Sequence, residues 1–228
     1  MLDYDSLHCL PSSHTLPDSK DTPLDNQLQH LVPGLLESIL ALIWSQRQDW
    51  FFGAGMGIYY DPKKPAIVPE GFLSIGVPRV KGINEDLRPS YVLWEEKKSP
   101  ILALEIVSKT YREEHITKGN IYAQDLEILY YVIYCPLRTI KEKLEVYKLT
   151  NGEYILQPRN PVWLPEIGLG IGKEIGTYQG ITREWLYWFD EQGKRFLTPE
   201  ERIQESEEKV HKLTEMLKKL GIDPESLM

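Results

Sequence analysis

Apolar residues near the start of the chain follow a helical pattern. Between Leu28 and Ile43 they recur every three or four residues, which predicts an amphipathic helix with one buried face. Thr22 and the proline after it are residue types that begin helices, so we expect the helix to start there. Pro33 lies inside the pattern and is expected to kink the helix or restart it.

The middle of the chain alternates extended runs with one helical segment. The runs are rich in aromatic and β-branched residues and are separated by turn residues, which is typical of strands. They cover residues 50–60, 66–77, 91–96, 101–108, 130–134 and 143–149, with a helical pattern at 112–125. The run at 101–108 is apolar on both faces, as expected of a central strand. This order predicts an α/β fold in which helices flank a central mixed sheet.

The last segment is a charged helical pattern. Thr198 and Glu201 form a predicted capping box with proline at the first helical position. Apolar residues then recur at coiled-coil spacing, with Ser206 in the remaining seam position: Ile203, Val210, Leu213, Leu217 and Leu220. Two interpretations stay open, a short coiled coil and a helix packed on its own domain. Because the seam is too short to be stable alone, we predict a homodimer or larger homo-oligomer.

These patterns divide the chain into three parts. Residues 1–22 are expected to be a flexible N-terminal leader, residues 23–196 one α/β domain, and residues 197–228 a helical tail. A chain of 228 residues has room for one sizeable core, and two full domains would be tight.

Composition bears on where the protein works. No apolar stretch reaches the roughly 18 residues that span a bilayer, and the N-terminus lacks the features of a signal peptide, so we expect a soluble protein without a membrane partner. Cys9 and Cys135 are the two cysteines and form no CxxC pair, which favours the reducing cytoplasm. The net charge of −8 counts against a protein that coats nucleic acid non-specifically. It does not exclude a nuclease, because metal-binding carboxylates add negative charge.

Glu105 is the most informative single residue. It interrupts the apolar run at 101–108, and on a strand it shares a face with Ala103 and Val107. A lone ionised carboxylate in such a place is very costly unless it is paired or holds a metal. A structural salt bridge or an edge position is the alternative, and the apolar residues on both faces weaken the edge position.

Two further elements supply partners for Glu105. Glu70 follows a proline at the start of another strand, and two acids on adjacent strands can share a hard cation such as magnesium. Glu114, Lys118 and Tyr122 are four residues apart and so line one helical face. Taken alone, Glu114 and Lys118 would be read as a surface pair. A lysine directed at two carboxylates can instead neutralise charge that develops on a phosphate.

Together these residues resemble a known family. The series formed by Glu70 after its proline, Glu105 with Ser108 three residues later, then Lys118 and Tyr122, is similar to the Uma family of bacterial restriction-endonuclease-like proteins. That family belongs to the PD-(D/E)XK nuclease superfamily, and the resemblance runs over roughly residues 23–190.

The resemblance implies a restriction-endonuclease-like fold and a hydrolase: a metal-dependent endonuclease that acts on DNA. Glu70 and Glu105 would bind Mg²⁺ or Mn²⁺ together with the Ile106 carbonyl, and Lys118 would be the catalytic lysine. Three other residues are candidates for contacts around these groups: Tyr122, Glu114 and Glu37.

The sequence departs from the family pattern at several positions. Glu70 stands where the family usually has aspartate, so its carboxylate reaches one methylene further. Residues after the Glu-x-x-Ser motif also differ, as do Leu126 and Tyr134. The alternative function is therefore a catalytically degenerate nuclease-like scaffold that acts as a binding or assembly module. A cation between Glu70 and Glu105 would favour the enzyme, and a Lys118–Glu105 contact that fills the space would favour the scaffold.

Overall fold

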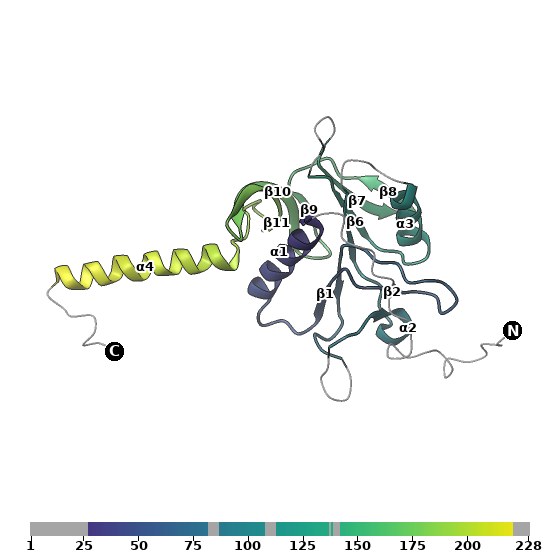
Figure 1. Cartoon of the computed structure of the whole chain (residues 1–228), viewed down its shortest axis with the longest axis horizontal. Coiled ribbons are helices and arrows are strands. Elements are labelled where there is room, and N and C mark those ends of the chain that lie inside the picture. Colours follow the sequence, from purple (N-terminus) through teal and green to yellow (C-terminus); the bar gives the residue numbers. More distant parts are fainter. Residues whose placement is uncertain (1–26, 82–86, 108–112, 137, 139–141, 221–228) are drawn as a thin grey trace.

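The structure is a computed structural model that describes residues 27–81, 87–107, 113–136, 138 and 142–220 (Figure 1). Side chains are described for these residues except 113–115. The expected leader and the helix start at Thr22 lie outside the described residues.

A six-stranded mixed sheet forms the centre of the fold. Its strands lie in the order β1 (Trp50–Ala54), β3 (Gly71–Ile75), β5 (Leu102–Ile106), β6 (Tyr130–Tyr134), β7 (Leu144–Thr150) and β8 (Glu153–Leu156). β5 and β6 are parallel, and all other neighbours are antiparallel. Every residue of β5 is buried and the strand has a neighbour on each side. The prediction of a mixed sheet with 101–108 in its interior is therefore confirmed.

Helices cover both faces of this sheet. α1 (Leu28–Ile43) packs near β1, and α3 (Glu113–Gln124) connects β5 to its parallel neighbour β6 (Figure 1). Alternate residues of β5 divide between two hydrophobic cores, as strand geometry requires. Leu104 joins the core that contains α1, and Ala103 joins the core that contains Tyr122 of α3. Glu105 follows the same alternation and points toward α3.

The expected restart of the first helix does not occur, because α1 runs without interruption through Pro33. Proline removes only the hydrogen bond to the carbonyl four residues earlier, here that of Gln29 in the first turn. Pro33 itself is buried with its apolar neighbours, and that packing favours the continuous helix.

A second sheet packs against α1 and was not predicted from the sequence. Its strands are β9 (Val162–Leu164), β10 (Leu169–Tyr178) and β11 (Ile181–Phe189), with β10 in the middle. α1 packs against β11, and the indole Nε1 of Trp188 donates a hydrogen bond to the Leu36 carbonyl at 3.0 Å. The fold therefore extends its α1-side core well beyond the central sheet.

The extended run expected at 91–96 is only partly a strand. β4 (Tyr91–Val92) pairs in parallel with β2 (Ile58–Tyr59), and the chain then forms the short helix α2 (Leu93–Glu96). Glu96 is held by two hydrogen bonds from the buried guanidinium of Arg88, at 2.9 and 3.2 Å. This ion pair ties the helical turn to the body, and it overrides the extended preference of the aromatic residues.

α4 (Pro199–Lys219) leaves the body of the molecule and extends away from it (Figure 1). The predicted capping box is present: Glu201 N donates to Thr198 Oγ1, and Thr198 N donates to Glu201 Oε2. None of its residues is buried, so the helix does not pack its seam on its own domain. Among the described residues, every helix is too short or too polar to span a lipid bilayer.

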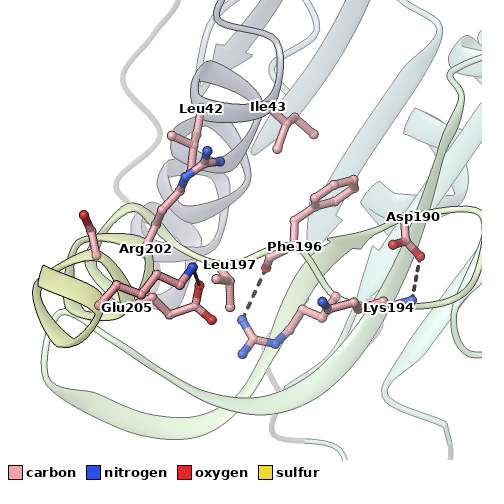
Figure 2. Close-up of a pocket in the computed structure, with 11 residues that line it drawn as sticks. Leu42, Ile43, Asp190, Lys194, Phe196, Leu197, Arg202 and Glu205 are labelled. Carbon is pink, nitrogen blue, oxygen red and sulfur yellow. Dashed lines mark hydrogen bonds and ion pairs between the residues drawn. The ribbon is translucent and has the colours of Figure 1, made fainter. Parts of the chain in front are cut away.

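A cavity of about 480 Å³ lies where α4 meets the body. Its walls include Leu42 at the end of α1, Phe196 before α4, and Arg202 and Ser206 on the first turns of α4 (Figure 2). The cavity marks the root of α4, since the helix lines it only as far as Lys209, in its third turn.

Candidate active site

Strand register brings Glu70 and Glu105 together. β3 and β5 are antiparallel, with Gly71 opposite Leu104. Extending this register by one residue places Glu70 opposite Glu105, and side chains of directly opposed residues lie close together on one face. The two carboxyl groups are near enough for the Glu70 side chain to hydrogen-bond with that of Glu105.

Glu105 is fully buried and is held by two residues of α3. Tyr122 OH donates to Glu105 Oε1 at 2.6 Å, and Lys118 Nζ lies 2.9 Å from Glu105 Oε2. Lys118 Nζ also donates to the Val68 carbonyl at 2.9 Å, so it bridges β5 and the segment before β3 that carries Glu70. The four-residue spacing of Lys118 and Tyr122 places both on the helical face that covers β5.

The electrostatics of Glu105 favour its neutral form. Burial raises the pKa of the Glu105 carboxyl well above its usual range, and the neighbouring Glu70 raises it further. The charge of Lys118 and the hydrogen bond from Tyr122 lower this pKa but do not offset the rise. Perturbed ionisable groups of this kind gather at functional sites more often than elsewhere. Two adjacent acids, one of them fully buried, are costly for the fold when both carry a charge.

Gln29 on α1 completes the cluster. Its Nε2 donates to Glu70 Oε1 at 3.1 Å and reaches the Ile106 carbonyl at 3.5 Å, while Ile106 N donates to Glu70 Oε2 at 3.4 Å. Gln29 therefore orients one acid and contacts the carbonyl next to the other.

Gln29 is a residue that the sequence analysis missed. It lies three residues before Val32 and seven before Leu36, both fully buried, so it belongs to the buried face of the helix. A polar residue in that position could have drawn attention to it.

The other two candidates do not join this cluster among the described side chains. Glu37 lies eight residues after Gln29, about 12 Å along the helix. Burial raises the pKa of Glu37 and its charged neighbour is Arg79, so it belongs to a different environment. Glu114 is part of α3, but its side chain lies outside the described residues.

Comparison with known proteins places this cluster in a family context. The sequence model of Uma2, described as "Putative restriction endonuclease", matches residues 21–174. The chain belongs to the Uma2 family. Among solved structures it is similar to the crystal structure of a "putative nuclease belonging to DUF820" from Anabaena variabilis ATCC 29413. The two are 14% identical, the match covers 63% of this chain and 75% of that chain, and the TM-score is 0.47. No match is found among curated proteins.

The Uma2 match spans every residue of the cluster. It begins before α1, which carries Gln29, and ends inside β10. The strands and helix that bring the two acids and Lys118 together thus lie within the family region, whereas β11 and α4 lie beyond its end.

The oxygen atoms of the site suit a hard cation. Magnesium takes carboxylate and carbonyl oxygens, and the Uma2 cluster offers two carboxylates and the Ile106 carbonyl. The described residues contain no group of three or more His, Cys, Asp and Glu side chains that could hold a metal. A cation here would therefore need the backbone oxygen and water in addition to Glu70 and Glu105. The donor set fits magnesium, which commonly keeps several waters.

Proposed function

We propose that the protein is a magnesium-dependent endonuclease of the PD-(D/E)XK type that hydrolyses phosphodiester bonds in DNA. The observation that carries this proposal is the position of the half-buried Glu70 carboxyl group beside the fully buried Glu105 carboxyl group, which Lys118 also contacts. Membership of a family described as restriction endonucleases supports DNA as the substrate.

Each residue of the cluster has a part in the proposed reaction. Glu70, Glu105 and the Ile106 carbonyl would hold Mg²⁺ or Mn²⁺. The ion supplies a Lewis acid that activates water and neutralises charge on the phosphate. Tyr122 fixes the Glu105 carboxylate through its hydroxyl. Lys118 places a positive charge beside the acids, where it can stabilise negative charge that develops on the scissile phosphate.

A second candidate function is a nuclease-like scaffold that binds or assembles without cleavage. The Lys118–Glu105 contact at 2.9 Å favours it, because the ammonium group takes one of the oxygens that a metal would need. Glu70 in place of the usual aspartate favours it too. In this alternative Lys118 is the permanent counter-ion of Glu105, and no cation enters.

A cleavage assay separates the two candidates. Supercoiled, linear and single-stranded DNA would be incubated with the full chain in Mg²⁺, in Mn²⁺ and in chelator. We expect metal-dependent cleavage by the wild type, none by Glu105→Gln, and unchanged cleavage by Glu153→Gln, which alters an exposed acid of β8. Equal cleavage by wild type and Glu105→Gln would exclude the mechanism, and no cleavage of any DNA by the wild type would favour the scaffold.

Lys118 has a distinct expected phenotype. Lys118→Ala should lower the cleavage rate by roughly two to three orders of magnitude while DNA binding persists, since removing one preorganised stabilising group has such an effect. Single-turnover rates and DNA binding in Ca²⁺ would be measured together, with Lys64→Ala as the control because Lys64 pairs with Asp125 on the surface. Parallel loss of binding and rate would contradict this role.

The proposal includes a cytoplasmic location and a self-associating chain, a homodimer or larger homo-oligomer. The support for self-association is the apolar seam of α4, which the rest of the described chain leaves uncovered.

A further inference from the structure

We infer that two copies of this chain pair through α4 as a parallel, two-stranded coiled coil. The inference rests on the proposed self-association and deepens it, because it specifies the surface, the number of helices and their direction.

The apolar seam of α4 is exposed to solvent. Ile203, Val210, Leu213 and Leu220 are 59%, 60%, 61% and 75% exposed. All lie on one stripe of a helix that has no buried residue. A contiguous apolar stripe on an otherwise charged helix marks an interaction site. Since the same helix carries the stripe in every copy of the chain, a second copy offers a matching surface.

The residue types along the seam of α4 match a two-stranded coiled coil. Spacing of seven puts Ile203, Val210 and Leu217 at one core position, called a, and Leu213 and Leu220 at the other, called d. β-branched residues at a with leucine at d favour two parallel strands over three or four. Two of the three a residues and both apolar d residues follow this rule.

Ser206 is the polar residue at the first d position of the seam. In a parallel pair Ser206 meets Ser206 of the second copy, so the seam has one polar layer. In an antiparallel pair of equal overlap, each Ser206 would face Leu217 of the other copy, which disturbs two apolar layers. The parallel arrangement thus keeps more of the seam apolar.

Charges beside the seam favour the same direction. Arg202 precedes an a position and Glu207 follows a d position, the places where parallel helices exchange salt bridges. A parallel pair brings Arg202 near Glu207 of the second copy, and symmetry repeats the contact. The antiparallel pair sets Glu207 near Thr214 and gives no such exchange.

The root of α4 fixes the direction in which the helix leaves the body. Arg195 binds Glu201 through two nitrogens, at 2.7 and 2.9 Å, and Thr198 caps the first turn. Arg202, Glu205, Ser206 and Lys209 line the cavity beside α1, so the first three turns of α4 lie next to the body (Figure 2). A parallel pair then holds both nuclease-like domains at the same end of the paired helices.

Sedimentation of the full chain tests the surface and the number of copies. We expect a two-chain mass for the wild type at micromolar concentration and a one-chain mass for Leu213→Glu. His211→Glu adds the same charge on another face of the helix and should keep the two-chain mass. A wild-type mass of one, three or four chains, or a two-chain mass for Leu213→Glu, would overturn the inference.

Cysteine cross-linking tests the direction. Leu220→Cys lies at the far end of the seam, so oxidation should join two copies only if the helices are parallel. Glu215→Cys points away from the seam about 7.5 Å nearer the body and should give no more covalent dimer than the wild type, whose own cysteines set the background. A dimer that depends on Leu213 but gives no Leu220→Cys cross-link would overturn the parallel arrangement while self-association stands.

Discussion

Glu105 is the central residue of the site, and its neighbours have opposing effects on its charge. Burial and Glu70 disfavour its charge, whereas Lys118 and Tyr122 favour it. Ionisable groups whose pKa values are strongly shifted by burial and neighbouring charges are found at functional sites more often than elsewhere. A cation would remove the conflict, because it would compensate both acids at once.

Glu105→Gln should stabilise the metal-free protein. The folded state raises the pKa of Glu105, so stability is greatest below the ordinary glutamic acid pKa and is lost as pH rises through the raised value. Glutamine resembles the protonated acid, so the free energy of unfolding of the variant should rise relative to that of the wild type as pH increases. Each unit of pKa difference corresponds to about 1.4 kcal/mol. Thermal melts in chelator across pH would show this, with Glu153→Gln as a flat control. A variant less stable than the wild type at neutral pH would contradict it.

Gln29 should act as a positioning residue. Gln29→Leu keeps the approximate side-chain size but removes the donor to Glu70 and the Ile106 carbonyl. We expect the Mg²⁺ concentration for half-maximal cleavage to rise roughly 10–100-fold, as for other residues that orient metal ligands. The rate at saturating Mg²⁺ should change less. Gln124→Leu, at an exposed position of α3, is the control. An unchanged Mg²⁺ requirement would remove Gln29 from the site.

Glu105 could be singled out from its apolar strand, and helix periodicity placed Lys118 and Tyr122 on one face, but only the family resemblance connected Lys118 with Glu105. Sequence reasoning could not find Gln29, because only the packing of α1 against the end of β5 brings that amide to Glu70. Glu37 was a weaker candidate on the same helix, and a sequence pattern does not say which turn of a helix crosses the sheet end.

At the scale of elements, the unit from β5 through α3 to β6 was the most predictable. Its strands are buried on both faces and read as continuous apolar runs, and its helix separates them. β9, β10 and β11 were not predicted. β10 mixes glycine and charged residues and is half exposed, so its alternation is weak. Pairing with β11, which itself packs on α1, determines β10 instead.

The cap of α4 offers a test at this scale. Thr198→Ala removes the acceptor for Glu201 N and should destabilise the first turn by about 1 kcal/mol. Because the first turn fixes the root of α4, self-association should weaken too. Circular dichroism melts and sedimentation would be compared with Thr150→Ala, at an exposed strand end. Unchanged helix content and an unchanged mass in sedimentation would show that the cap stabilises neither α4 nor the self-association.

At the scale of the whole molecule, the proposals assign different tasks to two regions. The Uma2 match covers the part that builds the acidic cluster, and α4 lies beyond it. With a net charge of −8, DNA in the proposed reaction would meet a local arrangement of cations and metal rather than a generally basic surface. In that mechanism the metal would bear on both substrate binding and chemistry.

The most direct test of the central claim is anomalous scattering from a crystal of the full chain soaked in Mn²⁺. The account predicts a peak between Glu70 and Glu105, at about 2–2.6 Å from oxygen atoms of both carboxylates and of the Ile106 carbonyl. Lys118 Nζ should then have left Glu105 Oε2, where it lies at 2.9 Å without the ion. The absence of a peak at saturating Mn²⁺, with Lys118 still bound to Glu105, would contradict the metal-dependent mechanism.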